Sequence, residues 1–245
     1  MIKIVSCFWN AEQYIANSIK SLKNQKDKDF EVYLIDDMST DNTVSVINKL
    51  IEGDSRFNLI INTEKKFKLK NLDDLICTFN DDDIVVELDG DDFLLGDGVI
   101  SEIKEMYKNK NTWLTNGSFM YTDGTNGFSS KADPNNVRTS VFTFSHLRTW
   151  KTFLWKSIPK EYFKDGDGSY FKSAADVAYT IPLLELSGEE HYVFNPKILY
   201  VYNGSSPYND HKNGSASGGG LQEQSRCANI IRNKQKLNKL VKWAI

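Results

Sequence analysis

Three carboxylates lie within four residues at the end of an apolar run. The segment VVELDGDDFLL, residues 85–95, places Asp89, Asp91 and Asp92 directly behind β-branched residues that are typical of a buried strand. Two unit charges about 4 Å apart repel each other by about 1 kcal/mol in water and by about 4 kcal/mol near a protein surface. A bound cation would offset this repulsion. The alternative is an acidic turn with solvated aspartates, in which Gly90 supplies an unusual backbone angle.

A second acidic pair closes another apolar run, because residues 30–37 (FEVYLIDD) end in Asp36 and Asp37. Both runs belong to an alternation of strand-like and helix-like segments over the first 88 residues. This alternation predicts an α/β fold with a mostly parallel sheet flanked by helices. Ligands of such sheets bind outside the carboxyl ends of the strands. We therefore expect the two acidic clusters on one functional rim.

The elements that must position these acids follow from apolar periodicity. We expect strands over 2–8, 30–37, 57–63 and 83–88, and helices over 14–22, 44–51 and 72–79, the first with Asn10 as its N-cap. From about residue 113 a smaller mixed section begins, with strands over 113–124 and 140–150 and a strand pair over 192–203. Its helices are expected over 147–157 and 173–187, the second broken early by Pro182. Three parts result, residues 1–112, 113–225 and a basic C-terminal helix over 226–245.

Composition fits an ordinary globular protein of 245 residues, 40% of them hydrophobic. The net charge of -3 does not indicate a nucleic-acid or membrane binder. The three cysteines Cys7, Cys77 and Cys227 lie far apart, as expected for thiols of a reducing compartment. No apolar run approaches the roughly 20 residues of a membrane span, and the first residues do not resemble a signal peptide. We expect a cytoplasmic protein without a membrane span.

Three motifs in order resemble a known family: VSCFWNAEQYI…SLKNQ, YLIDDMSTDNT and VVELDGDDFLL. They are similar to those of the family-2 glycosyltransferases of the GT-A fold, although Trp9 stands where that family commonly has Tyr. Further along, FSHLRTWK, DGDGSYFKSAADVAYTIPLLELSG and YNDHK resemble a virus- and phage-rich branch. The resemblance implies a GT-A fold and transfer of a sugar, with inversion, from a nucleotide-sugar donor to a hydroxyl acceptor. A UDP-sugar is the expected donor.

The resemblance also implies a metal cofactor, Mn²⁺ or Mg²⁺, which would stabilise the departing diphosphate as a Lewis acid. Asp91 would be the direct ligand, Asp89 would face the ribose or a metal-bound water, and His211 would be a further ligand. Asp92 would face the acceptor. Asp176 would be the general base that takes the proton of the acceptor hydroxyl. The alternative for Asp176 is a first-turn acid that interacts with the helix dipole.

The nucleoside would be held by residues from the ends of the first two strands. By resemblance these are Ser6, Phe8, Asn10, Glu12 and Asp36, with Asp37 supporting the loop. Lys66 or Lys68 would meet the diphosphate.

The acceptor stays open between a modified DNA base and a glycan or protein. For DNA, phosphate contacts would come from His146, Arg148 and the basic tail: Arg226, Arg232, Lys234, Lys236, Lys239 and Lys242. A catalytically inactive module that binds sugar nucleotides or glycans is a further alternative.

Overall fold

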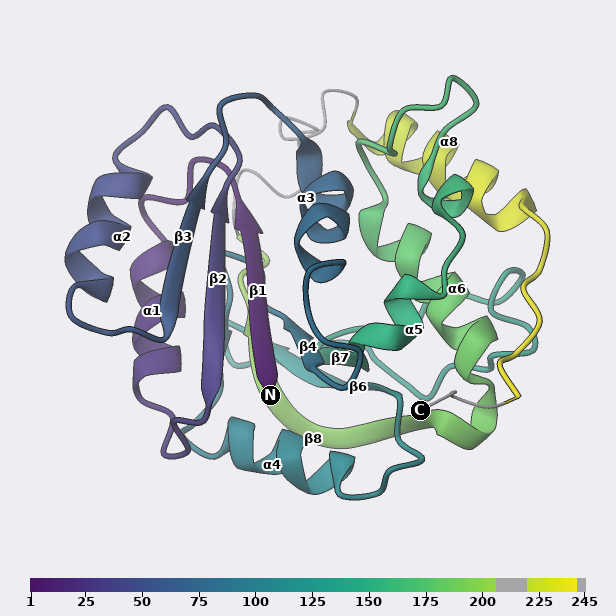
Figure 1. Ribbon diagram of the computed structural model, residues 1–245, viewed down its shortest axis with the longest axis horizontal. Helices are drawn as coiled ribbons and strands as arrows, with labels where there is room; N and C mark the ends of the chain where they lie inside the picture. Colours follow the sequence, from purple (N-terminus) through teal and green to yellow (C-terminus); the bar gives the residue numbers. More distant parts are fainter. Residues whose placement is uncertain (206–219, 242–245) are drawn as a thin grey trace.

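The computed structural model describes residues 1–205 and 220–241 and contains one eight-stranded sheet (Figure 1). The strand order is β3-β2-β1-β4-β7-β6-β8-β5. The strands are β1 (Ile2–Phe8), β2 (Phe30–Asp36), β3 (Phe57–Ile61), β4 (Ile84–Glu87), β5 (Phe93–Leu94), β6 (Leu114–Tyr121), β7 (Arg148–Lys151) and β8 (Tyr192–Tyr202).

The first half of the sheet is parallel, as the alternation of elements predicts. β1 pairs with β2 on one side and with β4 on the other, and β2 pairs with β3. β1, β2 and β4 are mainly buried on both faces, whereas most of the edge strand β3 is exposed, and successive residues point to opposite sides. In β4, for example, Val85 belongs to one hydrophobic cluster and Val86 to the other. The carboxyl ends of β1, β2 and β4 consequently meet at one edge.

The second half of the sheet is mixed, which confirms the predicted smaller section. β7 runs antiparallel to β4 and β6, whereas β8 is parallel to β6 and antiparallel to the short β5. β7 is shorter than expected, because β4 offers partners only from Ile84 to Glu87 before its chain turns into the acidic loop. Residues 192–202 form one long strand and not a strand pair.

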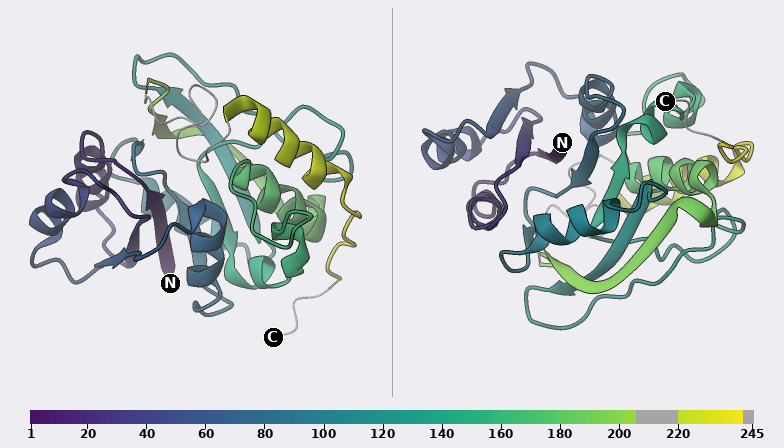
Figure 2. Two further views of the ribbon diagram at one scale, coloured as in Figure 1. Left: turned by 90° about the horizontal axis from the view of Figure 1, so that it is seen from above. Right: turned by 60° about the horizontal axis from the view of Figure 1, so that its bottom comes forward.

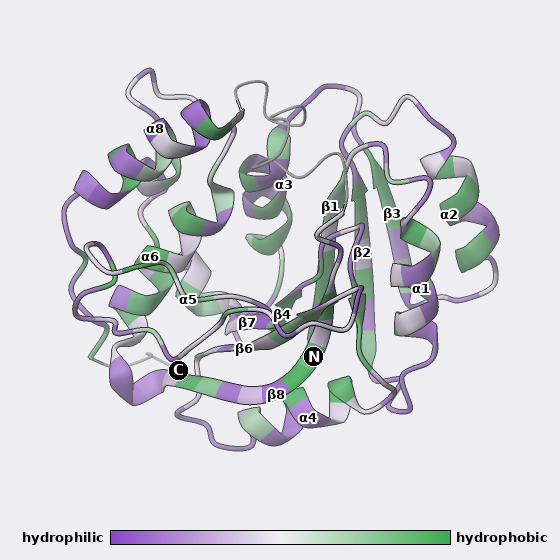
Figure 3. Ribbon diagram, turned by 180° about the vertical axis from the view of Figure 1, so that it is seen from behind, coloured by the Kyte–Doolittle hydropathy of each residue, from purple (hydrophilic) through white to green (hydrophobic). Residues whose placement is uncertain are grey.

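Helices cover both faces of the sheet (Figure 2). The cluster on one face includes side chains of α1 (Ile15–Lys23), α2 (Thr43–Ile51) and α4 (Val99–Tyr107). The cluster on the other face includes side chains of α3 (Phe67–Ile76), α5 (Thr152–Lys156), α6 (Ala175–Ser187) and α8 (Gly220–Asn233). The 3₁₀ turns η1 (Lys160–Phe163) and η2 (Glu189–His191) flank α6. In Figure 3, α1 and α8 alternate hydrophobic and hydrophilic residues, whereas β1 and β2 are mainly hydrophobic.

Two helices differ from the sequence-based expectation. α6 continues through Pro182, because every residue from Ala178 to Ser187 is buried and this packing outweighs the roughly 3 kcal/mol that proline costs inside a helix. The C-terminal helix ends at Asn233, well before residue 245. Beyond it the backbone bonds to α6 instead of to itself, since Leu237 N donates to Glu185 (2.9 Å) and Leu240 N donates to the carbonyl of Leu186 (2.9 Å).

Within residues 1–205 and 220–241, no helix is both long enough and apolar enough to cross a lipid bilayer.

Candidate active site

A cavity of about 300 Å³ opens where β1 and β4 end, between α3 and the start of α6. Its lining carries four carboxylates, those of Asp37, Asp89, Asp91 and Asp176. It also carries four cationic side chains, Lys65, Lys68, Arg148 and Lys172. Residues from the first and second halves of the chain thus face one another across a single polar cavity.

The acidic loop after β4 divides its three aspartates between the cavity and the interior. Asp89 and Asp91 line the cavity. Gly90 between them does not adopt a left-handed backbone; a Cβ there would lie 2.6 Å from the Cβ of Phe8. The glycine is therefore required by close packing of the loop on β1, and not by a left-handed turn as in the alternative interpretation of the acidic segment.

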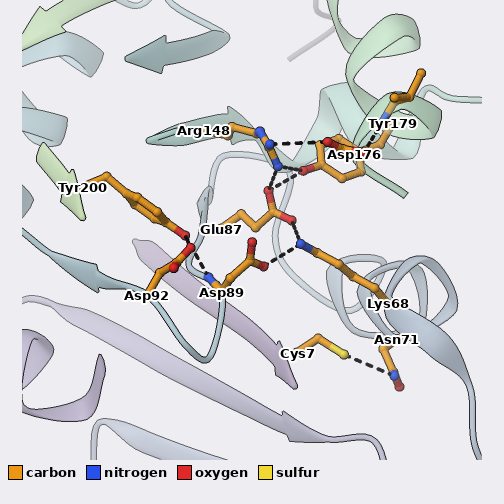
Figure 4. Close-up of polar contacts among 11 residues, drawn as sticks. Cys7, Lys68, Asn71, Glu87, Asp89, Asp92, Arg148, Asp176, Tyr179 and Tyr200 are labelled. Carbon is orange, nitrogen blue, oxygen red and sulfur yellow. Dashed lines mark hydrogen bonds and ion pairs between the residues drawn. The ribbon is translucent and has the colours of Figure 1, made fainter. Parts of the chain in front are cut away.

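Asp92 lies beneath the loop, fully buried, and it is not part of the cavity wall. Its carboxylate accepts hydrogen bonds from the Tyr200 hydroxyl (2.6 Å) and from the backbone N–H of Asn203 (2.7 Å), as Figure 4 shows for Tyr200. Burial raises the pKa of Asp92 well above its usual value, and the neighbouring Asp91 and Asp89 raise it further. This arrangement does not support the expected acceptor-side role, because the carboxyl anchors β8 under the loop.

The two aspartates at the end of β2 lie in different surroundings: Asp37 lines the cavity and Asp36 does not. Asp36 is buried, and its Oδ2 accepts a hydrogen bond from Ser39 N (3.0 Å) within the following turn. Asp37 lines the cavity and accepts hydrogen bonds from the backbone N–H groups of Lys66 and Phe67, both at 2.9 Å. Burial would raise the pKa of Asp37, but these hydrogen bonds, together with those of Asn71 and Asn62 and the charge of Lys65, lower it overall.

Of the four predicted residues near the end of β1, two line the cavity, Phe8 and Asn10. Asn10 is not an N-cap: it adopts a φ of 52°, α1 begins only at Ile15, and its Oδ1 accepts a hydrogen bond from Thr40 N (2.8 Å). Ser6 is buried within β1. Glu12 binds the backbone N–H of Asn42 (3.0 Å) and thereby ties this loop to the start of α2.

The basic segment at the start of α3 (residues 65–70) reaches the cavity through Lys65 and Lys68 but not through Lys66. Lys66 pairs with Asp74 on α3, 3.3 Å away. Lys65 lies 4.3 Å from the centre of the Trp9 ring and donates to the carbonyl of Asp37 (3.1 Å).

Lys68 bridges two carboxylates, because its Nζ lies 2.5 Å from Asp89 Oδ1 and 2.8 Å from Glu87 Oε1. The charges of Asp89 and Glu87 keep the pKa of Lys68 well above its usual value, although burial acts in the opposite direction.

Asp176 lies in the first turn of α6 and lines the same cavity as the acidic loop, from the second half of the chain. The helix starts from Ala174, whose left-handed φ of 55° is uncommon for a residue with a Cβ. Arg148, from β7, is 4% exposed and its guanidinium lies 3.6 Å from the Asp176 carboxylate.

His146 also lines the cavity, is 5% exposed, and has an Nδ1 with no hydrogen-bond partner among the residues that the structure describes. Burial lowers the pKa of its ring well below 6.5, and the adjacent Arg148 lowers it further. The ligand atoms of Asp89, Asp92 and His146 lie within 4.8 Å of one another. His211, the predicted further ligand, lies outside the described residues.

Sequence reasoning missed two buried residues behind the cavity, Glu87 on β4 and Tyr179 on α6. Glu87 is directly opposite Arg148 in the register of β4 and β7, with 2.9 Å between the charged groups. Its signal in the sequence is an acid inside the apolar run IVVEL. Burial would raise the pKa of Glu87, but Lys68 and Arg148 lower it strongly overall.

Comparisons with known proteins agree with this architecture. The curated relatives include the chondroitin synthase of Pasteurella multocida, 27% identical over 78% of this chain and 20% of the relative. The chain spans about half or less of the length of the curated relatives that it matches.

Among solved structures, S. aureus TarS 1–349 in complex with UDP-GlcNAc superposes with a TM-score of 0.70 at 16% identity, over 94% of this chain and 65% of that one. The mannosyltransferase PcManGT of Pyrobaculum calidifontis, in complex with GDP-Man and Mn²⁺, has a TM-score of 0.62 at 16% identity, over 96% of this chain and 65% of that one. These two structures share the fold. The family model of glycosyl transferase family 2 matches residues 3–169, and the chain therefore belongs to that family.

Proposed function

We propose that this chain transfers a sugar from a nucleotide-sugar donor to a hydroxyl group of an acceptor. The observation that carries the proposal is the cavity at the carboxyl ends of β1 and β4, with Asp89 and Asp91 on one side and Asp176 on the other. Its volume of about 300 Å³ lies at the lower end of the range for small-molecule sites. An open cavity between two acidic groups suits a reaction in which donor and acceptor approach from different sides.

The donor is proposed to be a UDP-sugar. Lys65, Lys68 and Lys172 line the cavity and supply positive charge for a diphosphate. The side chains of Trp9, Phe8 and Asn10 line the adjoining wall, where a nucleoside would lie. The TarS complex with UDP-GlcNAc supports the choice of nucleotide, because that protein shares this fold.

A divalent metal, Mn²⁺ or Mg²⁺, is proposed to be held by Asp91 with Asp89. The residues fit such an ion, because carboxylate oxygens are the ligands that both metals prefer and the crowded negative charge needs compensation. When bound, the metal would act as a Lewis acid toward the departing diphosphate. The Mn²⁺ complex of PcManGT supports this assignment. Lys68, in contact with Asp89, neutralises part of the same acidic cluster.

Asp176 is proposed as the general base of an inverting transfer. It would accept the proton of the acceptor hydroxyl as that oxygen attacks the sugar carbon from the face opposite the leaving group. Its position across the cavity from Asp89 and Asp91 is consistent with this role.

The proposed acceptor is a hydroxyl of a glycan and not a modified DNA base. Those of the cations expected to bind DNA phosphates that the structure describes have partners within the chain, whereas Lys242 lies outside the described residues. Arg226 pairs with Asp165 and Lys239 with Glu190. Arg232 donates to the carbonyl of Arg138 (2.7 Å). His146 and Arg148 are buried. The resemblance to the chondroitin synthase favours a saccharide over a nucleic acid.

The test is a screen of UDP-, GDP- and ADP-sugars with Mn²⁺, Mg²⁺ or EDTA, read as the melting temperature and then as nucleoside diphosphate release with saccharide acceptors. Binding raises the melting temperature by mass action. We expect a metal-dependent shift with a UDP-sugar and acceptor-dependent release of UDP. Binding without release would favour the inactive binding module, and no response to any donor would contradict the proposal. Hydroxymethylated DNA as a parallel acceptor tests the remaining alternative.

A further inference from the structure

A continuous set of charged contacts behind the cavity connects two of its four carboxylates, those of Asp89 and Asp176. Asp89 contacts Lys68 (2.5 Å), and Lys68 contacts Glu87 (2.8 Å). Glu87 contacts Arg148 (2.9 Å), and Arg148 reaches Asp176 (3.6 Å). Figure 4 shows the whole series, with side chains from α3, β4, β7 and α6. We call these five residues the charged bridge.

The charge balance of the bridge explains why its two ends are fixed. Glu87 and Arg148 are 1% and 4% exposed, so their charges need partners within the protein. Two cations, Lys68 and Arg148, share only one interior carboxylate, that of Glu87. Asp89 and Asp176 more than offset the one remaining positive charge, and both are partly exposed to the cavity. The interior of the bridge therefore attracts both cavity carboxylates.

Tyr179 fixes the middle of the bridge. Its hydroxyl lies 2.8 Å from Arg148 and also donates to Glu87, and its side chain is fully buried. The ring packs against both Trp150 and Trp155, with centroids 5.3 and 5.4 Å away, so the hydroxyl has little freedom to move. Tyr179 itself is not part of the cavity wall.

Tyr179 also shares a helix face with Asp176. The two residues are three positions apart in α6, a spacing that places side chains one above the other. Arg148 contacts both of them. A change at the Tyr179 hydroxyl is therefore transmitted to the Asp176 carboxylate through one guanidinium group.

We propose that Lys68, Glu87, Arg148 and Tyr179 are positioning residues that set the Asp176 carboxylate relative to the Asp89 side of the cavity. This inference rests on the proposed function, in which Asp176 is the base. Transfer requires the acceptor oxygen, the sugar carbon and the leaving diphosphate in line, and a displacement of about 1 Å can lower the rate by about 10²-fold. The bridge provides a rigid connection between the groups on the two sides of that line.

The test replaces Tyr179 by phenylalanine and compares it with a matched tyrosine. Y179F removes one hydroxyl and no charge, so the variant is expected to fold. Tyr192 is the control, since it is also buried and its hydroxyl also makes two contacts, with Asn116 Oδ1 (2.6 Å) and Ala132 N (3.0 Å), outside the bridge. We expect Y179F to lower kcat about tenfold with KM for the donor within about twofold, whereas Y192F keeps the wild-type kcat.

A double variant separates positioning from a general loss of stability. If Tyr179 acts through Asp176, adding Y179F to D176N should leave the residual rate unchanged. A further tenfold loss in that background, or a kcat for Y179F equal to that of Y192F, would overturn the inference while leaving the proposed function intact. A wild-type chain that transfers no sugar from any donor would instead overturn the proposed function, and the inference with it.

Discussion

Two buried carboxylates in this fold have similar partners but different surroundings. Glu87 is bonded to Lys68, Arg148 and the Tyr179 hydroxyl. Asp73, on α3, is bonded to Lys160, to the Tyr170 hydroxyl (2.6 Å) and to the Trp155 indole N–H (2.9 Å). Each is an acid near a lysine and a tyrosine, and each is at most 5% exposed.

The two carboxylates differ in what their partners contact in turn. The partners of Asp73 join α3 to α5 and to the segment around η1, and neither Asp73, Lys160 nor Tyr170 lines the cavity. The partners of Glu87, in contrast, contact Asp89 and Asp176, and these two residues line the cavity. A buried ion pair alone is therefore weak grounds for a functional role. The connection to groups that face a ligand-sized cavity is what separates the charged bridge from the Asp73 network.

Of the variants that separate the cavity from the Asp73 network, D91N is expected to lower the rate of sugar transfer most. Asp91 is the proposed direct metal ligand, and the metal contributes several kcal/mol to stabilising the leaving group. D91N should lower transfer by about 10³-fold, and it should abolish the metal-dependent melting shift with the donor. Urea unfolding without ligands checks that the fold is intact. A variant that retains turnover, or a wild-type rate unaffected by EDTA, would remove the metal from the proposal.

D176N is expected to have the next largest effect. Loss of a general base typically costs a factor of about 10² or more in rate, so kcat should fall by at least that factor with little change in donor affinity. Stability should change by less than about 1 kcal/mol, since the carboxylate is partly exposed. Initial rates at saturating donor, with donor affinity from calorimetry, measure both. Near-normal turnover would assign the base to another acid.

The position of Asp176 in the cavity lining also shows how much of the site can be predicted from the sequence. Strand-to-helix alternation predicts the parallel sheet, and the carboxyl ends of its strands predict which rim carries the acids. Asp89, Asp91 and Asp176 line the cavity as expected of site residues. Their roles remain proposals.

What the sequence could not supply is the direction of each side chain. In the two adjacent acidic pairs at the rim, one aspartate lines the cavity and its neighbour does not: Asp37 beside Asp36, and Asp91 beside Asp92. Local pattern does not distinguish them, because the choice depends on partners distant in sequence, such as Tyr200 for Asp92. The pairing of Glu87 with Arg148 likewise arises only when β7 aligns with β4.

D73N should affect stability and not catalysis. Hydrogen bonds to a charged group contribute about 1.5–3 kcal/mol, so we expect unfolding free energy to fall by about 2 kcal/mol while kcat stays at the wild-type value. The control is D74N, the next residue of α3, whose carboxylate is 40% exposed and pairs with Lys66 and Lys70. That variant should lose about 0.5 kcal/mol or less. A D73N variant with lowered kcat would show that the Asp73 network also reaches the active site.

The smallest expected effect is the pH dependence of the Asp73 contribution. Burial would raise the pKa of Asp73, but hydrogen bonds from Lys160, Tyr170 and Trp155 lower it below its usual value of 3.8. At acidic pH the unfolded chain therefore binds this proton before the folded protein does, so the stabilisation is complete above about pH 5 and is lost as pH falls through the folded pKa. Urea unfolding from pH 8 to pH 3 should show a constant difference between wild type and D73N at neutral pH that shrinks below about pH 4. Other carboxylates also contribute, Glu87 with a slope of the same sign and Asp92, whose pKa is raised, with the opposite sign, but they are common to both proteins and cancel in the difference. A difference that stayed constant down to pH 3 would mean that D73N destabilises by altered packing and not by loss of the charge.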